Sequence, residues 1–95
     1  MAKILTLSRL ERLALLLEEL GEAQQVIGKI LRHGYDSRHP DGGPDNAALL
    51  EMELGDVLAA IDLLVKAGDL DWGLIKDARQ TKPARSAPYL HHQKG

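Results

Sequence analysis

The sequence predicts an all-α fold in which two long antiparallel helices and a short third helix form a bundle that oligomerisation completes. Hydrophobic residues make up 44% of the 95 residues, yet there is no Phe and there are only two Tyr and one Trp. An aliphatic core of this kind favours helices, because aromatic residues are typical of strands. Apolar residues also recur with a helical period. A chain this short buries only a modest core, which favours oligomerisation.

The first predicted helix is delimited by local signals at both ends. Ser8, with Glu11 three residues later, has the pattern of a capping box, so the helix is expected to begin there. The helical period continues to about His33, and Gly34 ends it. The glycines and prolines that follow predict a loop over residues 35–45.

Two further helices and a tail complete the single predicted domain of residues 1–95. The second helix is expected from residue 45 or 46 to 67, where Gly68 stops it, and a shorter third helix from residue 69 or 71 to about 80. Prolines disfavour a helix at the residue before them. Pro83 and Pro88 therefore predict an irregular basic tail from about residue 81.

Charge and composition exclude several classes of protein. The net charge of −2, with both signs interspersed, lacks the broad basic surface of a nucleic-acid-binding protein. The absence of Cys excludes disulfides and thiolate metal sites. Charged residues interrupt the N-terminal apolar run, so neither a signal peptide nor a membrane span is predicted. We expect a cytoplasmic protein with no nucleic-acid or membrane partner.

Two acidic residues of the second predicted helix lie on its apolar side. At about 100° per residue, Glu53 and Asp56 fall within the apolar stripe, whereas Glu51, Asp62 and Lys66 fall on the opposite side. An ionised carboxylate without a partner costs several kcal/mol or more to bury. The stripe consists of Leu49, Leu50, Val57, Ala60 and Leu64.

The first predicted helix carries a matching acidic group. Glu18, Glu19 and Glu22 lie within an arc of about 100°, and Lys29 and His33 extend this arc toward the C-terminal end. On their own these glutamates are equally compatible with a solvated stripe. Paired with the acids of an antiparallel second helix, they have the arrangement of the carboxylate metal sites in helical bundles.

Carboxylates without His or Cys favour Mg²⁺, or Mn²⁺ in its place, over zinc or copper. Mg²⁺ keeps several waters and often takes substrate phosphates as its remaining ligands. The expected substrate is therefore a polyphosphate, which also needs basic side chains. Candidates for phosphate binding are Lys29, Lys82 and Arg85.

The motif Glu-Glu-x-x-Glu at residues 18–22, followed by Glu-x-x-Asp at 53–56, resembles that of the MazG-type nucleoside triphosphate pyrophosphohydrolases of the all-α NTP pyrophosphatase superfamily. The resemblance covers most of the chain. It implies Mg²⁺-dependent cleavage of an NTP or dNTP between the α and β phosphates, giving the monophosphate and pyrophosphate. It also implies that helices pair across subunits, which would make the protein a homodimer or homotetramer.

The resemblance implies roles for individual residues. Glu19, Glu22, Glu53 and Asp56 would be the metal ligands. Glu18 would be an additional ligand or, with Glu19, part of the catalytic pair that orients or deprotonates the attacking water. The segment 82–85, Lys-Pro-Ala-Arg, is similar to a basic element that reaches the substrate phosphates. The loop over 34–44 is longer than in short members of the family, and the Asn that often accompanies the basic element has no match.

Base recognition and two alternative functions stay open at this point. His33, Tyr35 and Trp72 are candidates for stacking on a base or bonding to it, although a Trp at this position is more often a core anchor and Tyr35 more often a loop cover. One alternative is a phosphoribosyl-ATP pyrophosphohydrolase, which would need a second basic cluster that the sequence does not show. The other is a non-catalytic helical dimerisation or adaptor module, whose acids pair with Arg32, Lys29 or a partner.

Overall fold

The computed structural model describes residues 3–94, and these residues form an all-helical fold. The helices are α1 (Leu7–His33), α2 (Asn46–Lys66) and α3 (Trp72–Ser86), followed by the short 3₁₀ helix η1 (Ala87–Tyr89). Within the described residues there is no strand, only an isolated antiparallel bridge between Arg38 and Asp45 in the first loop. The prediction of an all-α chain with two long helices and one shorter helix is confirmed.

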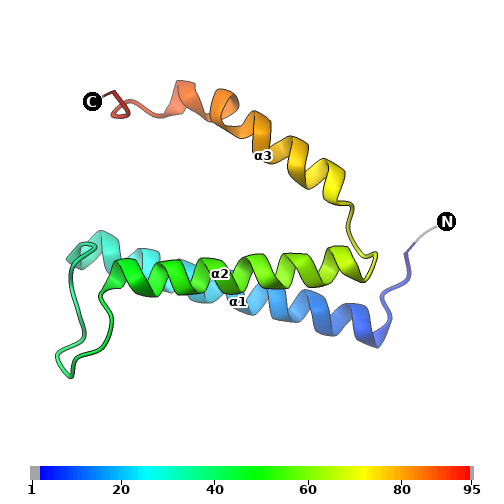
Figure 1. The fold of residues 1–95 in the computed structure, drawn as a ribbon, viewed down its shortest axis with the longest axis horizontal. Coiled ribbons are helices and arrows are strands. Elements are labelled where there is room, and N and C mark those ends of the chain that lie inside the picture. Colours follow the sequence, from blue (N-terminus) through cyan, green and yellow to red (C-terminus); the bar gives the residue numbers. More distant parts are fainter. Residues whose placement is uncertain (1–2, 95) are drawn as a thin grey trace.

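Helices α1 and α2 lie side by side and antiparallel, forming a helical hairpin (Figure 1). Apolar side chains of both helices are buried between them, and two of the five are alanines that allow close approach of the helices. The buried part of α2 is the apolar stripe that the sequence predicts. The buried core consists of Ala23, Val26, Val57, Ala60 and Leu64.

The start of α1 differs from the prediction by two residues. Thr6, not Ser8, caps the helix, and its hydroxyl accepts a hydrogen bond from the backbone N–H of Arg9. Ser8 lies inside the first turn, and its hydroxyl is 3.2 Å from that of Thr6. Thr6 is the cap because its extended backbone lets its side chain reach the free N–H groups of the first turn.

The start of α2 agrees with the prediction. Asp45 is the cap, and its carboxylate accepts a hydrogen bond from the N–H of Ala48. The preceding helix ends at Gly34, whose φ of 90° belongs to the left-handed region that favours glycine.

The predicted end of the third helix is wrong, and the irregular tail begins at residue 90 instead of about 81. Helix α3 continues to Ser86 and includes Pro83. Proline removes the backbone donor that would bond the carbonyl of Arg79, and side chains make further hydrogen bonds to other carbonyls of the same helix. The guanidinium of Arg85 donates to the carbonyl of Ala78, and the hydroxyl of Ser86 donates to the carbonyl of Lys82. The segment that contains Lys82 and Arg85 is therefore helical.

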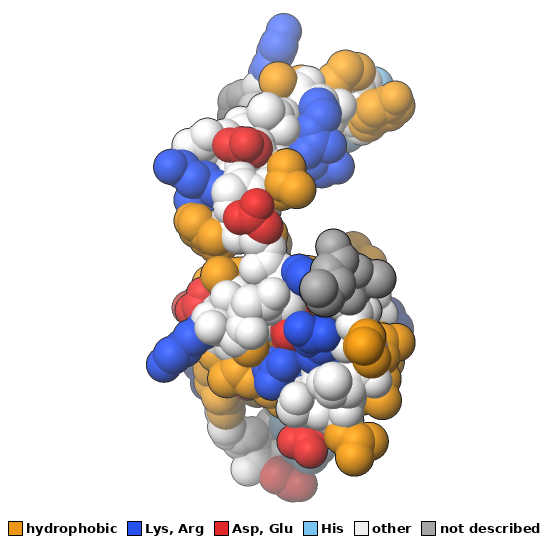
Figure 2. Space-filling view, turned by 90° about the vertical axis from the view of Figure 1, so that its right-hand side faces the viewer, with side chains coloured by type: hydrophobic (Ala, Val, Ile, Leu, Met, Phe, Trp, Pro, Cys, Tyr) orange, Lys and Arg blue, Asp and Glu red, His pale blue; other side chains and the backbone are white. Residues whose placement is uncertain are grey.

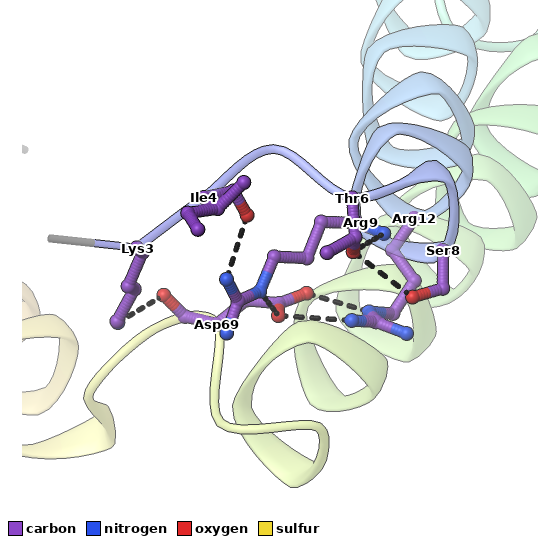
Figure 3. Close-up of polar contacts among 7 residues, drawn as sticks. All are labelled: Lys3, Ile4, Thr6, Ser8, Arg9, Arg12 and Asp69. Carbon is purple, nitrogen blue, oxygen red and sulfur yellow. Dashed lines mark hydrogen bonds and ion pairs between the residues drawn. The ribbon is translucent and has the colours of Figure 1, made fainter.

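A cluster of charged groups joins the start of α1 to the turn between α2 and α3 (Figure 3). The buried Asp69 carboxylate accepts two hydrogen bonds from Arg12 and lies 3.3 Å from the guanidinium of Arg9. Lys3 donates to the backbone carbonyl of Asp69. Asp71, rather than Asp69, caps α3. The cluster holds the end of the hairpin from which α3 departs.

Helix α3 stands away from the hairpin, and none of its residues is buried (Figure 1). The radius of gyration is 16.7 Å, against about 12 Å for a compact chain of this length. The accessible surface is 7750 Å², against roughly 5,400 Å² for a folded monomer of this mass. Hydrophobic side chains lie on the outer surface of both parts (Figure 2). No helix within residues 3–94 has the length and hydropathy needed to span a membrane.

Candidate metal centre

Four carboxylates from α1 and α2 converge at the interface between the two helices. Glu19 and Glu22 are three residues apart on α1, and Glu53 and Asp56 are three residues apart on α2, so each pair lies on one face of its helix. One oxygen atom from each of the four side chains lies within 4.8 Å of the others. We call this group the acidic cluster. It consists of the four residues that the motif resemblance implied as metal ligands.

The acidic cluster lacks a positive partner. Within residues 3–94, the ion pairs that form involve none of the four acids. One carboxylate oxygen of Glu19 and one of Glu53 are shielded from solvent and have no hydrogen-bond partner among the described residues. Glu19, Glu22 and Glu53 are half-buried, while Asp56 is exposed although its position on the wheel falls within the apolar stripe. Buried polar atoms of this kind normally have a partner.

The electrostatics of the cluster favour protonation or a bound cation. Burial, followed by the negative charges of Glu22 and Asp56, raises the pKa of Glu19 above its ordinary value. Burial and the adjacent carboxyl group of Glu22 likewise raise the pKa of Glu53. Mutual repulsion of ionised carboxylates destabilises the charged form of each group. A divalent cation would reverse this effect.

The geometry and the donor set suit a hard divalent cation. All the donors are carboxylate oxygens, which are the ligands that Mg²⁺ and Mn²⁺ prefer. Opposite oxygens around one Mg²⁺ lie about 4.2 Å apart, at roughly 2.1 Å from the ion. The observed limit of 4.8 Å therefore needs only a small contraction to enclose one ion.

Glu18 lies beside the acidic cluster but is not one of its four members. It is exposed on α1, and its negative charge contributes to raising the pKa of Glu19. Its carboxylate is therefore near the cluster and solvated.

The basic residues expected to bind phosphate are not all brought to the cluster. Lys29 is exposed on α1, about two turns beyond Glu22. Lys82 and Arg85 lie on α3, which stands away from the hairpin in a single chain (Figure 1). Arg85 also binds its own helix through Thr81 and Ala78.

The three candidates for base contact lie apart from one another. His33, at the end of α1, lines a pocket next to the first loop. The side chain of Tyr35 is in that loop and is 62% exposed. Trp72 begins α3, is 41% exposed instead of anchoring a core, and has the guanidinium of Arg79 at 5.4 Å from its ring centre.

Sequence patterns gave no indication of the pocket next to the first loop. It has a volume of about 380 Å³, and Arg32, Arg38 and His39 line it together with Lys29 and His33. We call it the basic pocket. These residues are scattered over α1 and the loop, so only the folded loop reveals that they share one site.

The chain was compared with family models, with curated proteins and with solved structures, and none of them matches it. The residues and their geometry are therefore the basis for inferring a function.

Proposed function

We propose that the protein is a Mg²⁺-dependent nucleoside triphosphate pyrophosphohydrolase that cleaves an NTP or dNTP between the α and β phosphates. The observation that carries this proposal is the acidic cluster, in which four carboxylates converge and two buried oxygens have no partner. A chain that leaves such a group uncompensated within residues 3–94 gains a stabilising counter-charge when a cation binds.

Each carboxylate of the site has a role in this proposal. Glu19, Glu22, Glu53 and Asp56 hold Mg²⁺, for which Mn²⁺ is a substitute. The bound ion neutralises phosphate charge and makes water a better nucleophile at neutral pH. Water attacks the α phosphorus, the bond from that phosphorus to the bridging oxygen breaks, and pyrophosphate leaves. Glu18, solvated beside the cluster, accepts the proton of the water.

We further propose that the active form is a homodimer or homotetramer. The single chain exposes roughly 2,000 Å² more surface than a folded monomer of its mass, and a standard protein interface buries a comparable area. Large apolar side chains are exposed on all three helices, including Leu17, Leu31, Leu58 and Leu74. Packing against another copy would cover α3 and give Lys82 and Arg85 a position next to an acidic cluster.

A panel of canonical and modified NTPs and dNTPs, assayed with Mg²⁺ for both pyrophosphate and orthophosphate, tests the proposed reaction. We expect nucleoside monophosphate and pyrophosphate in equal amounts, and no turnover when EDTA replaces Mg²⁺. Release of orthophosphate alone would contradict cleavage between the α and β phosphates. The same panel identifies the preferred base and sugar.

A further inference from the structure

The basic pocket lies where α1 ends, the first loop folds back and α2 begins. Lys29, Arg32 and Arg38 give its wall three positive charges, and His33 and His39 add two imidazoles. None of the residues that line it is Asp or Glu. A pocket of about 380 Å³ has the size of a small-molecule site.

Hydrogen bonds hold the wall of the basic pocket in place. Asn46 is buried, and its side-chain amide donates to the carbonyl of Gly34, 3.1 Å away. The backbone N–H of Asn46 donates to the carbonyl of Ser37. Arg38 donates to the carbonyl of Gly43 across the loop. The loop is thus fixed to the first turn of α2, which positions Arg38 opposite the exposed side chains of Lys29 and Arg32 on α1.

Two of the cations at the pocket have no counter-ion among the residues that the structure describes. Within residues 3–94, the ion pairs that form involve neither Lys29 nor Arg32. Cations held close together without acids repel one another, and an anion relieves this repulsion. The planar guanidinium group also matches the oxygens of a phosphate, with two parallel hydrogen bonds.

Two residues of the basic pocket lie on the same helix faces as two members of the acidic cluster. Lys29 follows Glu22 by seven residues on α1, and Asn46 precedes Glu53 by seven residues on α2. Seven residues are nearly two full turns, so each pair lies on one face of its helix, about 10 Å apart along the axis. The basic pocket is therefore about two helical turns from the acidic cluster.

We propose that the basic pocket is a phosphate-binding site that needs no divalent cation and is separate from the acidic cluster. Its ligand is a phosphate group, either in pyrophosphate or as a monoester on a sugar. In the first case the pocket receives the released product, and in the second it recognises a second phosphorylated end of the substrate. Lys29 and Arg32 carry the binding.

Calorimetric titration of the full-length protein in EDTA tests this site, with inorganic pyrophosphate and ribose 5-phosphate as separate probes. We expect saturable binding of at least one probe, about tenfold weaker in Lys29→Gln and in Arg32→Gln, since a charge-assisted hydrogen bond contributes about 1.5–3 kcal/mol. Tighter binding of pyrophosphate identifies the product as the ligand, and tighter binding of ribose 5-phosphate identifies a phosphorylated sugar.

Two control variants separate this site from general charge effects and from the acidic cluster. Lys66→Gln removes an exposed cation at the opposite end of the hairpin and should leave the affinity unchanged. Glu53→Gln should also retain binding, even if it abolishes turnover. Absence of binding in EDTA, or equal weakening by Lys66→Gln, would overturn the proposal. Loss of binding in Glu53→Gln would show that the site depends on the acidic cluster and is not separate from it, which would also overturn the proposal.

Discussion

One end of the helical hairpin and its middle both hold carboxylates, but the surroundings of these charges act in opposite ways. At one end, hydrogen bonds from Arg12, together with the nearby charge of Arg9, lower the pKa of Asp69 although burial opposes this effect (Figure 3). In the middle of the hairpin, burial and neighbouring carboxylates raise the pKa of Glu19 and Glu53. Among the described residues, Asp69, which joins the helices, has positively charged partners. The acidic cluster has no such partner within residues 3–94, so its carboxylates are free to bind a cation.

The largest expected effect is a loss of activity when the acidic cluster is altered. Replacing Glu53 or Asp56 with Ala removes a proposed cation ligand, and we expect Mg²⁺-dependent pyrophosphate release to fall by on the order of 10²- to 10³-fold, as when one electrostatic stabiliser is removed from an active site. Glu51→Ala, an exposed acid on the same helix, is the matched control and should retain activity. Unchanged turnover in both cluster variants would remove the acidic cluster from the mechanism.

A smaller effect on activity is expected when a basic residue proposed to bind the substrate phosphates is replaced. If Lys82 binds the substrate phosphates, Lys82→Gln should raise KM for the triphosphate about tenfold with little change in kcat. Lys76→Gln, another exposed lysine of α3, serves as the control. An unchanged KM in Lys82→Gln would place the phosphate contact elsewhere, and Lys29 would be the next candidate.

Opposite changes in stability should follow when the two carboxylate sites are neutralised. Asp69→Asn leaves Arg9 and Arg12 without their partner, so we expect the midpoint of urea unfolding to fall. Glu53→Gln removes repulsion within the acidic cluster, so the midpoint in EDTA should stay the same or rise. Both variants are measured at one protein concentration, because oligomerisation affects stability. A fall in the midpoint for Glu53→Gln would show that the cluster is already compensated.

The pH dependence of stability should show the same contrast with a smaller amplitude. Because the pKa of Glu53 is raised above its ordinary value of 4.5, the folded state binds more protons than the unfolded state above that pH, and stability in EDTA falls as the pH rises. Because the pKa of Asp69 is lowered below 3.8, its contribution is present above that pH and is lost as the pH falls. The midpoint of urea unfolding, plotted between pH 3 and about 7, should fall less steeply on the high-pH side in Glu53→Gln and on the low-pH side in Asp69→Asn than in the unmodified chain. A pH profile that both variants share with the unmodified chain would contradict these assignments.

Local signals predicted the helices better than they predicted how the helices meet. The second helix was located to within one residue, because Asp45 and Gly68 are strong signals at its two ends. The end of the third helix was missed, since the helix continues through Pro83, which the local sequence rule takes as a boundary. The separation of α3 from the hairpin depends on packing, which no local pattern describes.

The candidate sites divide in the same way. The acidic cluster could be predicted because each pair has helical spacing and lies within one apolar stripe or arc. The cluster around Asp69 joins residues 57 positions apart, and the basic pocket needs the loop to fold back over α1. Neither leaves a periodic trace in the sequence. The places of Arg32 and Arg38 in the basic pocket, and of Asp69 in its charged cluster, could therefore be identified only in the folded chain.

Cation binding by the acidic cluster is tested most directly by titrating the protein with Mn²⁺ and following free Mn²⁺ by electron paramagnetic resonance. We expect saturable binding in the unmodified chain and in Glu51→Gln, competition by Mg²⁺, and loss of this binding in Glu53→Gln and Asp56→Asn. Equal binding of Mn²⁺ by all four proteins, or none by the unmodified chain, would contradict a divalent cation site at Glu19, Glu22, Glu53 and Asp56.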